Sequence, residues 1–352
     1  MRAVGRFVTY HIPVPQEQSG IELDEFLCLS FPLLNKGYLR RQVREGKVLV
    51  DGNPALPSQR LKIDQVLYID FEEPEDMPAA PVAPRAQVPV LFENEDVLVV
   101  DKPAGLAVEP ERWERGKACL AGALLELTLD RSGWEPTEEG ETPEAVDFRP
   151  RLVHRIDKDT SGAVLVAKHL EAERELRSAF ESGGVSKHYL ALVEGEYRER
   201  EEEDIIDLPI APDAKKSGRM RISEKDGKPS RTRVEVAEAF RGFTLLACEP
   251  ITGRTHQIRV HLREIGFPLC VDPVYGRRDA LLLSEIKPGY KQKRGRAEQP
   301  LIDRLTLHAH KIRFPGREGD IEVEAPVPRD LERVLKQMRK VRPPRTGRGG
   351  SA

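Results

Sequence analysis

The densest group of polar side chains in the sequence lies at residues 151–162, which read Arg-Leu-Val-His-Arg-Ile-Asp-Lys-Asp-Thr-Ser-Gly. The apolar run 163–167 follows at once and is typical of a buried strand. A polar loop beside a rigid strand is a common position for catalytic groups. Its two carboxylates, Asp157 and Asp159, can do covalent or acid–base chemistry, or they can cap the turn through hydrogen bonds to the backbone. Residue type and spacing leave both interpretations open.

A second polar run, residues 253–261, offers a complement to these carboxylates. If the chain is helical from Gln257, His256 and Arg259 are three residues apart and can aim into one site. A guanidinium near a carboxylate keeps it ionised and oriented through charge-assisted hydrogen bonds. His256 and His261 are five residues apart, which is not the spacing of a helical metal pair, and no cysteine or acidic ligand set joins them. The sequence therefore predicts no metal site.

The elements that must position these runs are mostly strands. Apolar and β-branched residues predict two strands within 90–100 and further strands at 163–168, 189–195, 232–238 and 243–250. Helical periodicity in the same part of the chain predicts helices at 172–181 and 257–265. Because helices are interspersed irregularly among the strands, the pattern favours an α+β fold with a mixed, mostly antiparallel sheet over a βαβ repeat.

The chain is expected to divide into five segments. Residues 1–20 are an N-terminal extension, 21–71 a small α+β unit, 72–89 a proline-rich extended linker, 90–335 the large domain and 336–352 a basic, disordered tail. The small unit combines an apolar helix face near Phe26, a basic helix, and two strands separated by a tight turn. Within the large domain, 287–299 is predicted to be a polar, glycine-containing loop.

Composition excludes several classes of protein. The chain has 352 residues and is 39% hydrophobic and 33% charged, with no apolar run long enough to span a bilayer, so a soluble, cytoplasmic protein is expected. The net charge is −3, but basic residues gather at 36–47 and 287–296, where they can form local phosphate-binding surface. The four cysteines form no CxxC pair and are predicted to be buried free thiols.

Residues 90–330 resemble the RluA family of RNA pseudouridine synthases. Several motifs carry the resemblance, in family order: DKPAG at 101–105, HRIDKDTSG at 154–162, SKHY at 186–189 leading into 190–195, GRTHQIRVH at 253–261, and DPVYG at 272–276. Each motif alone has little specificity. Together, at family-like separations, they are specific and span most of the chain.

The unit at 21–71 resembles the alpha-L RNA-binding domain first described in a small-subunit ribosomal protein. The resemblance rests on the basic helix with Arg40, Arg41 and Arg44, and on the following GKVLVDG from Gly46 to Gly52. RluA-type synthases commonly carry such a domain ahead of the catalytic one. The resemblance implies that these arginines and Lys47 bind RNA.

The family resemblance implies that the protein converts uridine in RNA to pseudouridine without a cofactor or metal. Asp157 is then the catalytic carboxylate, which either attacks the sugar or promotes an elimination to a glycal. Arg259 resembles the arginine that pairs with it, and Tyr189 the residue that stacks on the target uracil. Arg155 resembles the arginine that fills the space left by the flipped nucleotide. Asp159 is offset from the motif position and is expected to be structural.

Two other classes of protein fit the sequence less well. An inactive RNA-binding protein would not need Asp157, Tyr189 and Arg259 together. A glycosidase would need two carboxylates across the scissile bond, and Lys158 and the RNA-binding unit fit that chemistry poorly. Among RNAs, the N-terminal unit favours large-subunit ribosomal RNA over transfer RNA, and a monomer without membrane partners is expected.

Overall fold

The computed structural model describes residues 7–31, 34, 36–72, 88–109, 118–132, 148, 150–198, 204–292, 295 and 297–344. They fall into two compact units, one drawn from 1–87 and 109–151 and the other from 88–108 and 152–352. The predicted boundaries place 109–151 in the catalytic domain instead. Much of that segment, and most of the predicted linker, lies outside the described residues, so these boundaries stay predictions.

The first unit is built on a small antiparallel sheet with the strand order β1-β4-β2-β3. Its elements are β1 (Phe7–Pro13), a 3-10 turn η1 (Gln16–Gln18), α1 (Leu23–Ser30), α2 (Lys36–Arg44), β2 (Val48–Val50), β3 (Asn53–Pro54), β4 (Val66–Glu72) and α3 (Leu120–Ser132). Leu23, Phe26 and Leu27 of α1 form a core with Leu39 of α2 and Ile69 of β4. The helices and strands predicted for 21–71 are present.

The predicted N-terminal extension is wrong in its extent. β1 pairs with β4 along its whole length, from Phe7 opposite Glu72 to Pro13 opposite Val66. Tyr10 and Ile12 are buried in the core of the first unit, and Val14 beyond the strand joins them. The alternation of apolar and polar residues in β1 is too short to stand out in the sequence, and pairing with β4 fixes the strand.

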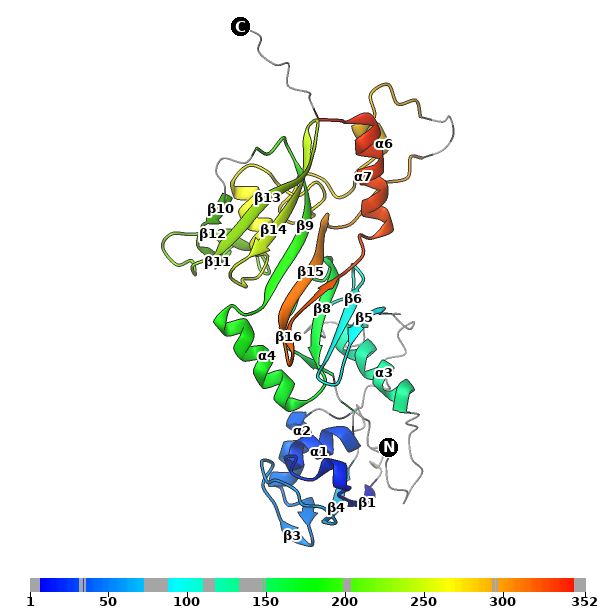
Figure 1. The fold of residues 1–352 in the computed structure, drawn as a ribbon, viewed down its shortest axis with the longest axis vertical. Helices are drawn as coiled ribbons and strands as arrows, with labels where there is room; N and C mark the ends of the chain where they lie inside the picture. Colours follow the sequence, from blue (N-terminus) through cyan, green and yellow to red (C-terminus); the bar gives the residue numbers. More distant parts are fainter. Residues whose placement is uncertain are drawn as a thin grey trace. The chain divides into compact units, whose positions relative to one another are not determined.

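The second unit contains the large sheet, with the order β10-β13-β14-β9-β15-β8-β6-β5 and β16 attached to β15 (Figure 1). Its strands are β5 (Val90–Glu93), β6 (Val97–Lys102), β8 (Ser161–Ala167), β9 (Ser186–Glu194), β10 (Asp204–Asp207), β13 (Arg231–Phe240), β14 (Phe243–Pro250), β15 (Leu307–Gly316) and β16 (Gly319–Glu324). Along this order only β15 and β8 are parallel. The predicted α+β fold with a mixed, mostly antiparallel sheet is confirmed.

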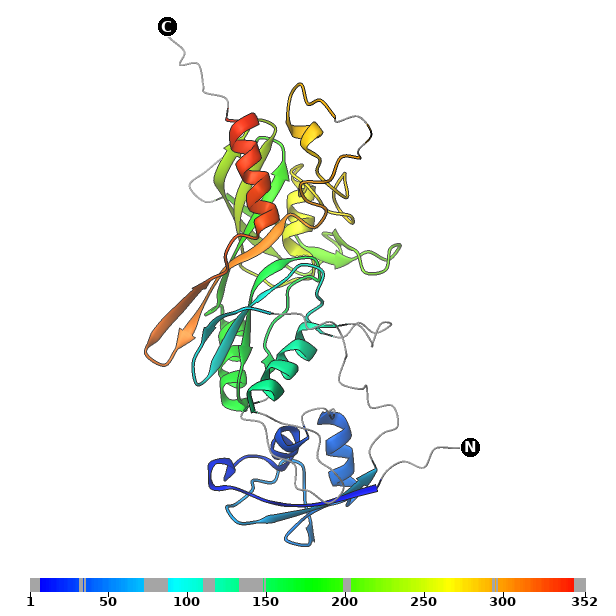
Figure 2. The same cartoon turned by 90° about the vertical axis from the view of Figure 1, so that its right-hand side faces the viewer.

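Among the residues that the structure describes, shorter strands and four helices complete the second unit. They are the paired strands β11 (Ile210–Pro212) and β12 (Met220–Ile222), and the helices α4 (Leu170–Ser182), α5 (Gln257–Glu264), α6 (Leu283–Ile286) and α7 (Arg329–Val341). The two-residue strand β7 (Arg151–Leu152) lies at the division between the units. Figure 2 shows the turn of the β15–β16 hairpin projecting to one side.

The predicted disordered tail begins too early. Helix α7 continues to Val341, and it buries Leu331, Val334, Leu335 and Met338 at the spacing of one helix face. These side chains pack against Phe243 and other residues of a core cluster that includes β14. The abundance of Arg and Lys in this helix concealed a narrow apolar stripe, so the tail can begin only after it. Residues 345–352 lie outside the described residues.

The strand that follows the polar loop is buried along its whole length. Every residue of β8 is buried, and Leu165 belongs to the same core cluster as Leu176 of α4. Gly162 has φ +117°, and a Cβ there would lie 2.2 Å from the carbonyl oxygen of Ala309 on β15. Only glycine allows β8 and β15 to approach this closely. The loop at 154–160 is therefore attached to a fixed point in the sheet.

The four cysteines of the chain all lie in the interior. Cys28, Cys119, Cys248 and Cys270 are buried free thiols, as predicted. In the described part of the chain, no helix is both long and apolar enough to cross a bilayer.

Candidate active site

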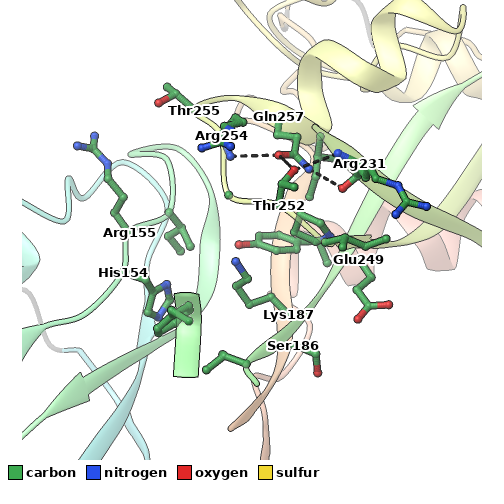
Figure 3. Close-up of a pocket in the computed structure, with 18 of the residues that line it drawn as sticks. His154, Arg155, Ser186, Lys187, Arg231, Glu249, Thr252, Arg254, Thr255 and Gln257 are labelled. Atoms are coloured by element: carbon green, nitrogen blue, oxygen red, sulfur yellow. Dashed lines mark hydrogen bonds between the residues drawn. The ribbon is translucent and has the colours of Figure 1, made fainter. Parts of the chain in front are cut away.

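A pocket of about 960 Å³ lies in the second unit, at the end of the polar loop that precedes β8 (Figure 3). Its walls come from that loop, the end of α4, the starts of β9 and β13, the end of β14, and residues 251–259. Asp157, Arg155, Tyr189 and Arg259 all line it. The structure thus brings together the four residues that the sequence predicted for the second unit. The volume of the pocket is near the upper limit of the range for small-molecule sites, which is about 300–1,000 Å³. The pocket therefore has room for more than one planar base.

Lys102 holds the loop that carries Asp157. The side chain is fully buried at the end of β6, and its Nζ donates hydrogen bonds to the carbonyl oxygens of Pro103, Leu106 and Lys158 at 2.7–2.9 Å. The amide of Gly105 also donates to the carbonyl of Lys158. Burial lowers the pKa of Lys102 to about 7. This residue orders the turn behind the site.

Asp157 is oriented by a guanidinium that is itself held in place. Nη1 of Arg259, on α5, donates to Oδ2 of Asp157 at 2.9 Å. Nε and Nη2 of Arg259 donate to the two carboxylate oxygens of Asp272 at 2.8 and 2.9 Å. Arg259 is 6% exposed and Asp272 1% exposed. A fork-to-fork ion pair of this kind fixes the direction of the third donor, which points at Asp157.

The Asp272 carboxylate also accepts hydrogen bonds from the backbone of its own turn. Its Oδ1 accepts from the amides of Val274 and Tyr275 at 2.8 and 3.0 Å. Burial alone would raise the pKa of Asp272, but the hydrogen bonds and charge of Arg259 outweigh it and leave the pKa below its ordinary value. Asp272 is therefore an ionised anchor for Arg259.

His256 presents one nitrogen to Asp157 and the other to Tyr275. It caps α5 in the left-handed conformation, with φ 55°. Tyr275 Oη accepts the amide of Met220 at 2.7 Å, so its proton is available for Nδ1 of His256 at 2.9 Å. Nδ1 then accepts, and Nε2 carries the proton of the neutral ring, 3.9 Å from Oδ1 of Asp157. Burial lowers the pKa of His256, which favours this neutral form.

We expect the Tyr275→Phe substitution to lower the population of the Nε2–H tautomer of His256. Without the phenol, Nδ1 of His256 loses its donor, and the Nδ1–H tautomer becomes populated. Nitrogen-15 chemical shifts of the imidazole rings measure this change. His261 is an internal control, since its nitrogens contact Thr232 and the Leu208 carbonyl and are unaffected. Protonation of His256 on Nδ1 in the unsubstituted protein would contradict the assignment.

Tyr189 and Arg155 lie on different walls of the pocket. Tyr189, on β9, is 9% exposed, and burial together with the negative charge of Asp157 raises the pKa of its phenol. Arg155 is exposed, in the loop that carries Asp157. Figure 3 shows its side chain on the same side of the pocket as Arg254 and Thr255. An aromatic side chain beside the carboxylate and a cation at the rim suit a planar base attached to an anionic backbone.

Three residues of the site were not singled out from the sequence. Asp272 and Tyr275 belong to the motif at 272–276, which entered only through the family resemblance. Lys187 belongs to the motif that contains Tyr189. In each case the available signal was a charged or aromatic residue inside a recognised motif. Asp159 is exposed and does not line the pocket. In the described part of the chain, no group of three or more His, Cys, Asp or Glu side chains could hold a metal ion.

The basic residues predicted in the first unit have different surroundings. Arg40 Nε donates to the buried carboxylate of Asp24 at 2.6 Å. Arg41 lies over the ring of Tyr38, 5.5 Å from its centroid. Arg44 and Lys47 have no side-chain partner in the described part of the chain. Part of this basic surface is therefore committed to folding, and the rest is available to a ligand.

Comparison with known proteins places this arrangement among enzymes of RNA modification. Residues 96–264 match the family described as RNA pseudouridylate synthase. The chain is 33% identical over 333 residues to an uncharacterised RNA pseudouridine synthase, YlyB, of Bacillus subtilis, covering 94% of this chain and 98% of that protein. It is also 33% identical over 343 residues to the ribosomal large subunit pseudouridine synthase C of Escherichia coli, covering 94% and 97%.

A third relative and a solved structure agree with these matches. The ribosomal large subunit pseudouridine synthase D of Nitrosomonas europaea is 32% identical over 335 residues, covering 95% of this chain and 89% of that protein. The structure of human RNA pseudouridylate synthase domain containing 4 superposes with a TM-score of 0.51 at 22% identity, covering 71% of this chain and 92% of that one. The structural likeness concerns the fold.

Proposed function

Because this chain belongs to the RluA-type family of RNA pseudouridine synthases, we propose that it isomerises specific uridines of large-subunit ribosomal RNA to pseudouridine. The observation that supports this most is the Asp157 carboxylate, held at one oxygen by Arg259 on the wall of a pocket large enough for a nucleotide. The names of two relatives, ribosomal large subunit pseudouridine synthases C and D, favour this RNA over transfer RNA.

In the proposed reaction Asp157 acts through Oδ1. Oδ2 accepts from Arg259, whereas Oδ1 has no hydrogen-bond donor in the described part of the chain and is free to react. The carboxylate either displaces the uracil from C1′, forming an ester bond that breaks when C5 attacks C1′, or it removes the C2′ proton in an elimination to a glycal and returns that proton when C1′ bonds to C5. In both routes the bond from C1′ to N1 breaks, the uracil turns while bound, C1′ bonds to C5, C5 loses its proton, and N1 gains one. The target nucleotide must first leave its stack, at a cost of a few kcal/mol.

Tyr189 is proposed to stack on the target uracil. Replacing it with Leu removes the aromatic face, and we expect a loss of about 1–3 kcal/mol, or roughly 5- to 150-fold in KM. Tyr189→Phe keeps the ring and is expected to keep the wild-type KM, which separates stacking from any role of the phenol in proton transfer. Steady-state kinetics on one RNA measures both variants. A wild-type KM in Tyr189→Leu would contradict the stacking role.

The first unit is proposed to contribute RNA contacts through Arg40, Arg41, Arg44 and Lys47. Counterion release on meeting phosphates would offset the cost of flipping. Arg44 and Lys47 are the better candidates, because Arg40 already donates to Asp24. We further propose a cytoplasmic monomer, and a dimer mass in solution light scattering would contradict that part.

The substrate class is tested by tritium release. Unmodified large-subunit ribosomal RNA and transfer RNA, each labelled with tritium at C5 of uracil, are incubated with the protein at equal uridine concentrations. Pseudouridine formation releases the label to water, and the proposal predicts release from the ribosomal RNA. Release from transfer RNA alone would replace the ribosomal assignment, and release from neither would contradict the proposal.

A further inference from the structure

Lys187 is a lysine of the pocket wall that the mechanism above does not use. It lies on β9, two residues before Tyr189, and both side chains line the pocket. Residues i and i+2 of a strand project from the same face, about 6.6 Å apart along the strand. Figure 3 shows the Lys187 side chain pointing into the pocket between His154 and Glu249.

Three arginines that line the same pocket each have a carboxylate partner, whereas Lys187 has none in the described part of the chain. The arginine pairs are Arg259 with Asp157 and Asp272, Arg233 with Glu249, and Arg231 with Asp207. The aromatic contact of Lys187 is with the ring of Phe180, 5.5 Å from Nζ to the centroid. Burial lowers the pKa of Lys187, which means that its surroundings destabilise the charged ammonium form.

The neighbouring His154 does not compensate this charge. Its Nε2 accepts the amide of Leu165 at 2.9 Å, and burial lowers its pKa to about 3, so the ring is neutral. A partly buried ammonium without a countercharge is unfavourable, and an anion in the pocket would remove that cost. RNA brings such an anion with every nucleotide.

We propose that Lys187 binds a phosphate of the RNA chain adjacent to the target uridine. This assignment rests on the proposed function and adds a phosphate subsite to it. If the uracil stacks on Tyr189, a phosphate bound to Lys187 is displaced from it by about 6.6 Å along β9. One nucleotide can span that distance. The pocket volume of about 960 Å³ leaves room for this flanking group.

If Lys187 had only a structural role, its replacement would affect the salt dependence of RNA binding differently. If the aliphatic stem of Lys187 only packs on Phe180, methionine should replace it without changing the dependence of RNA binding on salt. A phosphate contact releases counterions, so its loss must lower that dependence by about 0.7–1 in the slope of log Kd against log salt concentration. The slope separates charge from packing.

The test compares Lys187→Met, Lys187→Arg and Lys311→Met. Lys311 is the matched control, since it lies on the neighbouring strand β15, outside the pocket, and pairs with Glu322 at 2.9 Å. Dissociation constants for one uridine-containing RNA are measured by fluorescence anisotropy over roughly 50–200 mM salt. Tritium release by the unsubstituted protein is measured in parallel, and thermal melting serves as the folding control.

Lys187→Met is expected to raise Kd by about 5- to 10-fold at the lowest salt and to reduce the slope by about 0.7–1. Lys187→Arg and Lys311→Met are expected to keep the wild-type slope. An active wild type together with an unchanged slope in Lys187→Met would overturn the Lys187 assignment alone. Absence of tritium release in the wild type would overturn the proposed function itself.

Discussion

Replacing Asp157 with Asn should abolish pseudouridine formation while RNA binding persists. The amide keeps the shape of the side chain and can still contact Arg259, but it lacks the charge needed to attack C1′ or to promote elimination. Removal of a nucleophile that acts with its partners as a unit costs kcat at least about 10⁴-fold. Single-turnover tritium release under saturating protein measures this loss without interference from binding.

Asp159→Asn is the matched control for this experiment. It makes the same chemical change two residues away in the same loop, at an exposed position outside the pocket. It is expected to retain nearly the wild-type rate. An active Asp157→Asn variant, or equal losses in both variants, would show that the loop acts through its conformation and not through the Asp157 carboxylate.

The second large effect is expected at Asp272, which holds Arg259. Asp272→Asn leaves the buried guanidinium with one carboxylate in place of two. Removing one partner of a buried ion pair costs about 3–5 kcal/mol, and the lower end, about 3 kcal/mol, is expected because Asp157 remains beside Arg259. The freed guanidinium also misplaces Asp157, and a shift of about 1 Å can lower kcat about 100-fold. Urea unfolding and single-turnover kinetics measure the two effects.

This stability difference should depend on pH in a defined direction. The pKa of Asp272 is lowered on folding below its ordinary value of 3.8. A lowered pKa contributes stability that is present above about pH 3.8 and is lost as the pH falls through the folded pKa. The gap in unfolding free energy between wild type and Asp272→Asn should therefore be constant near neutrality and shrink below about pH 4.

Asp279→Asn provides the control for Asp272. Asp279 is exposed in the same connection and has no carboxylate-specific partner in the described part of the chain. It should change neither the unfolding free energy nor kcat. A gap for Asp272→Asn that widened toward acid pH would contradict the ionised anchor.

Much of the second unit could be predicted because its elements have local signals. Residues 243–250 read as a strand, and β14 has those bounds. The helix expected at 257–265 is α5, so His256 and Arg259 do aim at one carboxylate. Periodicity and residue type suffice where one face of an element is buried.

Contacts between segments that are far apart in the sequence could not be predicted. Arg259 and Asp157 are 102 residues apart and meet only through the order of strands in the sheet. The orienting role of Asp272 depends on a turn whose amides hold its carboxylate. Lys187 has no carboxylate partner in the described part of the chain. The sequence alone does not reveal this, because a partner can come from any segment that folds next to the lysine.

The central claim, isomerisation of uridine within RNA at the Asp157 pocket, is tested most directly by following the base itself. A short RNA substrate carrying tritium at C5 of its target uracil is incubated with the protein, and released tritium, free uracil and the mass of the RNA are measured together. We predict tritium in water, no free uracil, and an RNA whose mass changes only by the tritium lost. Free uracil with an RNA lighter by one base would show hydrolysis of the glycosidic bond and contradict the account.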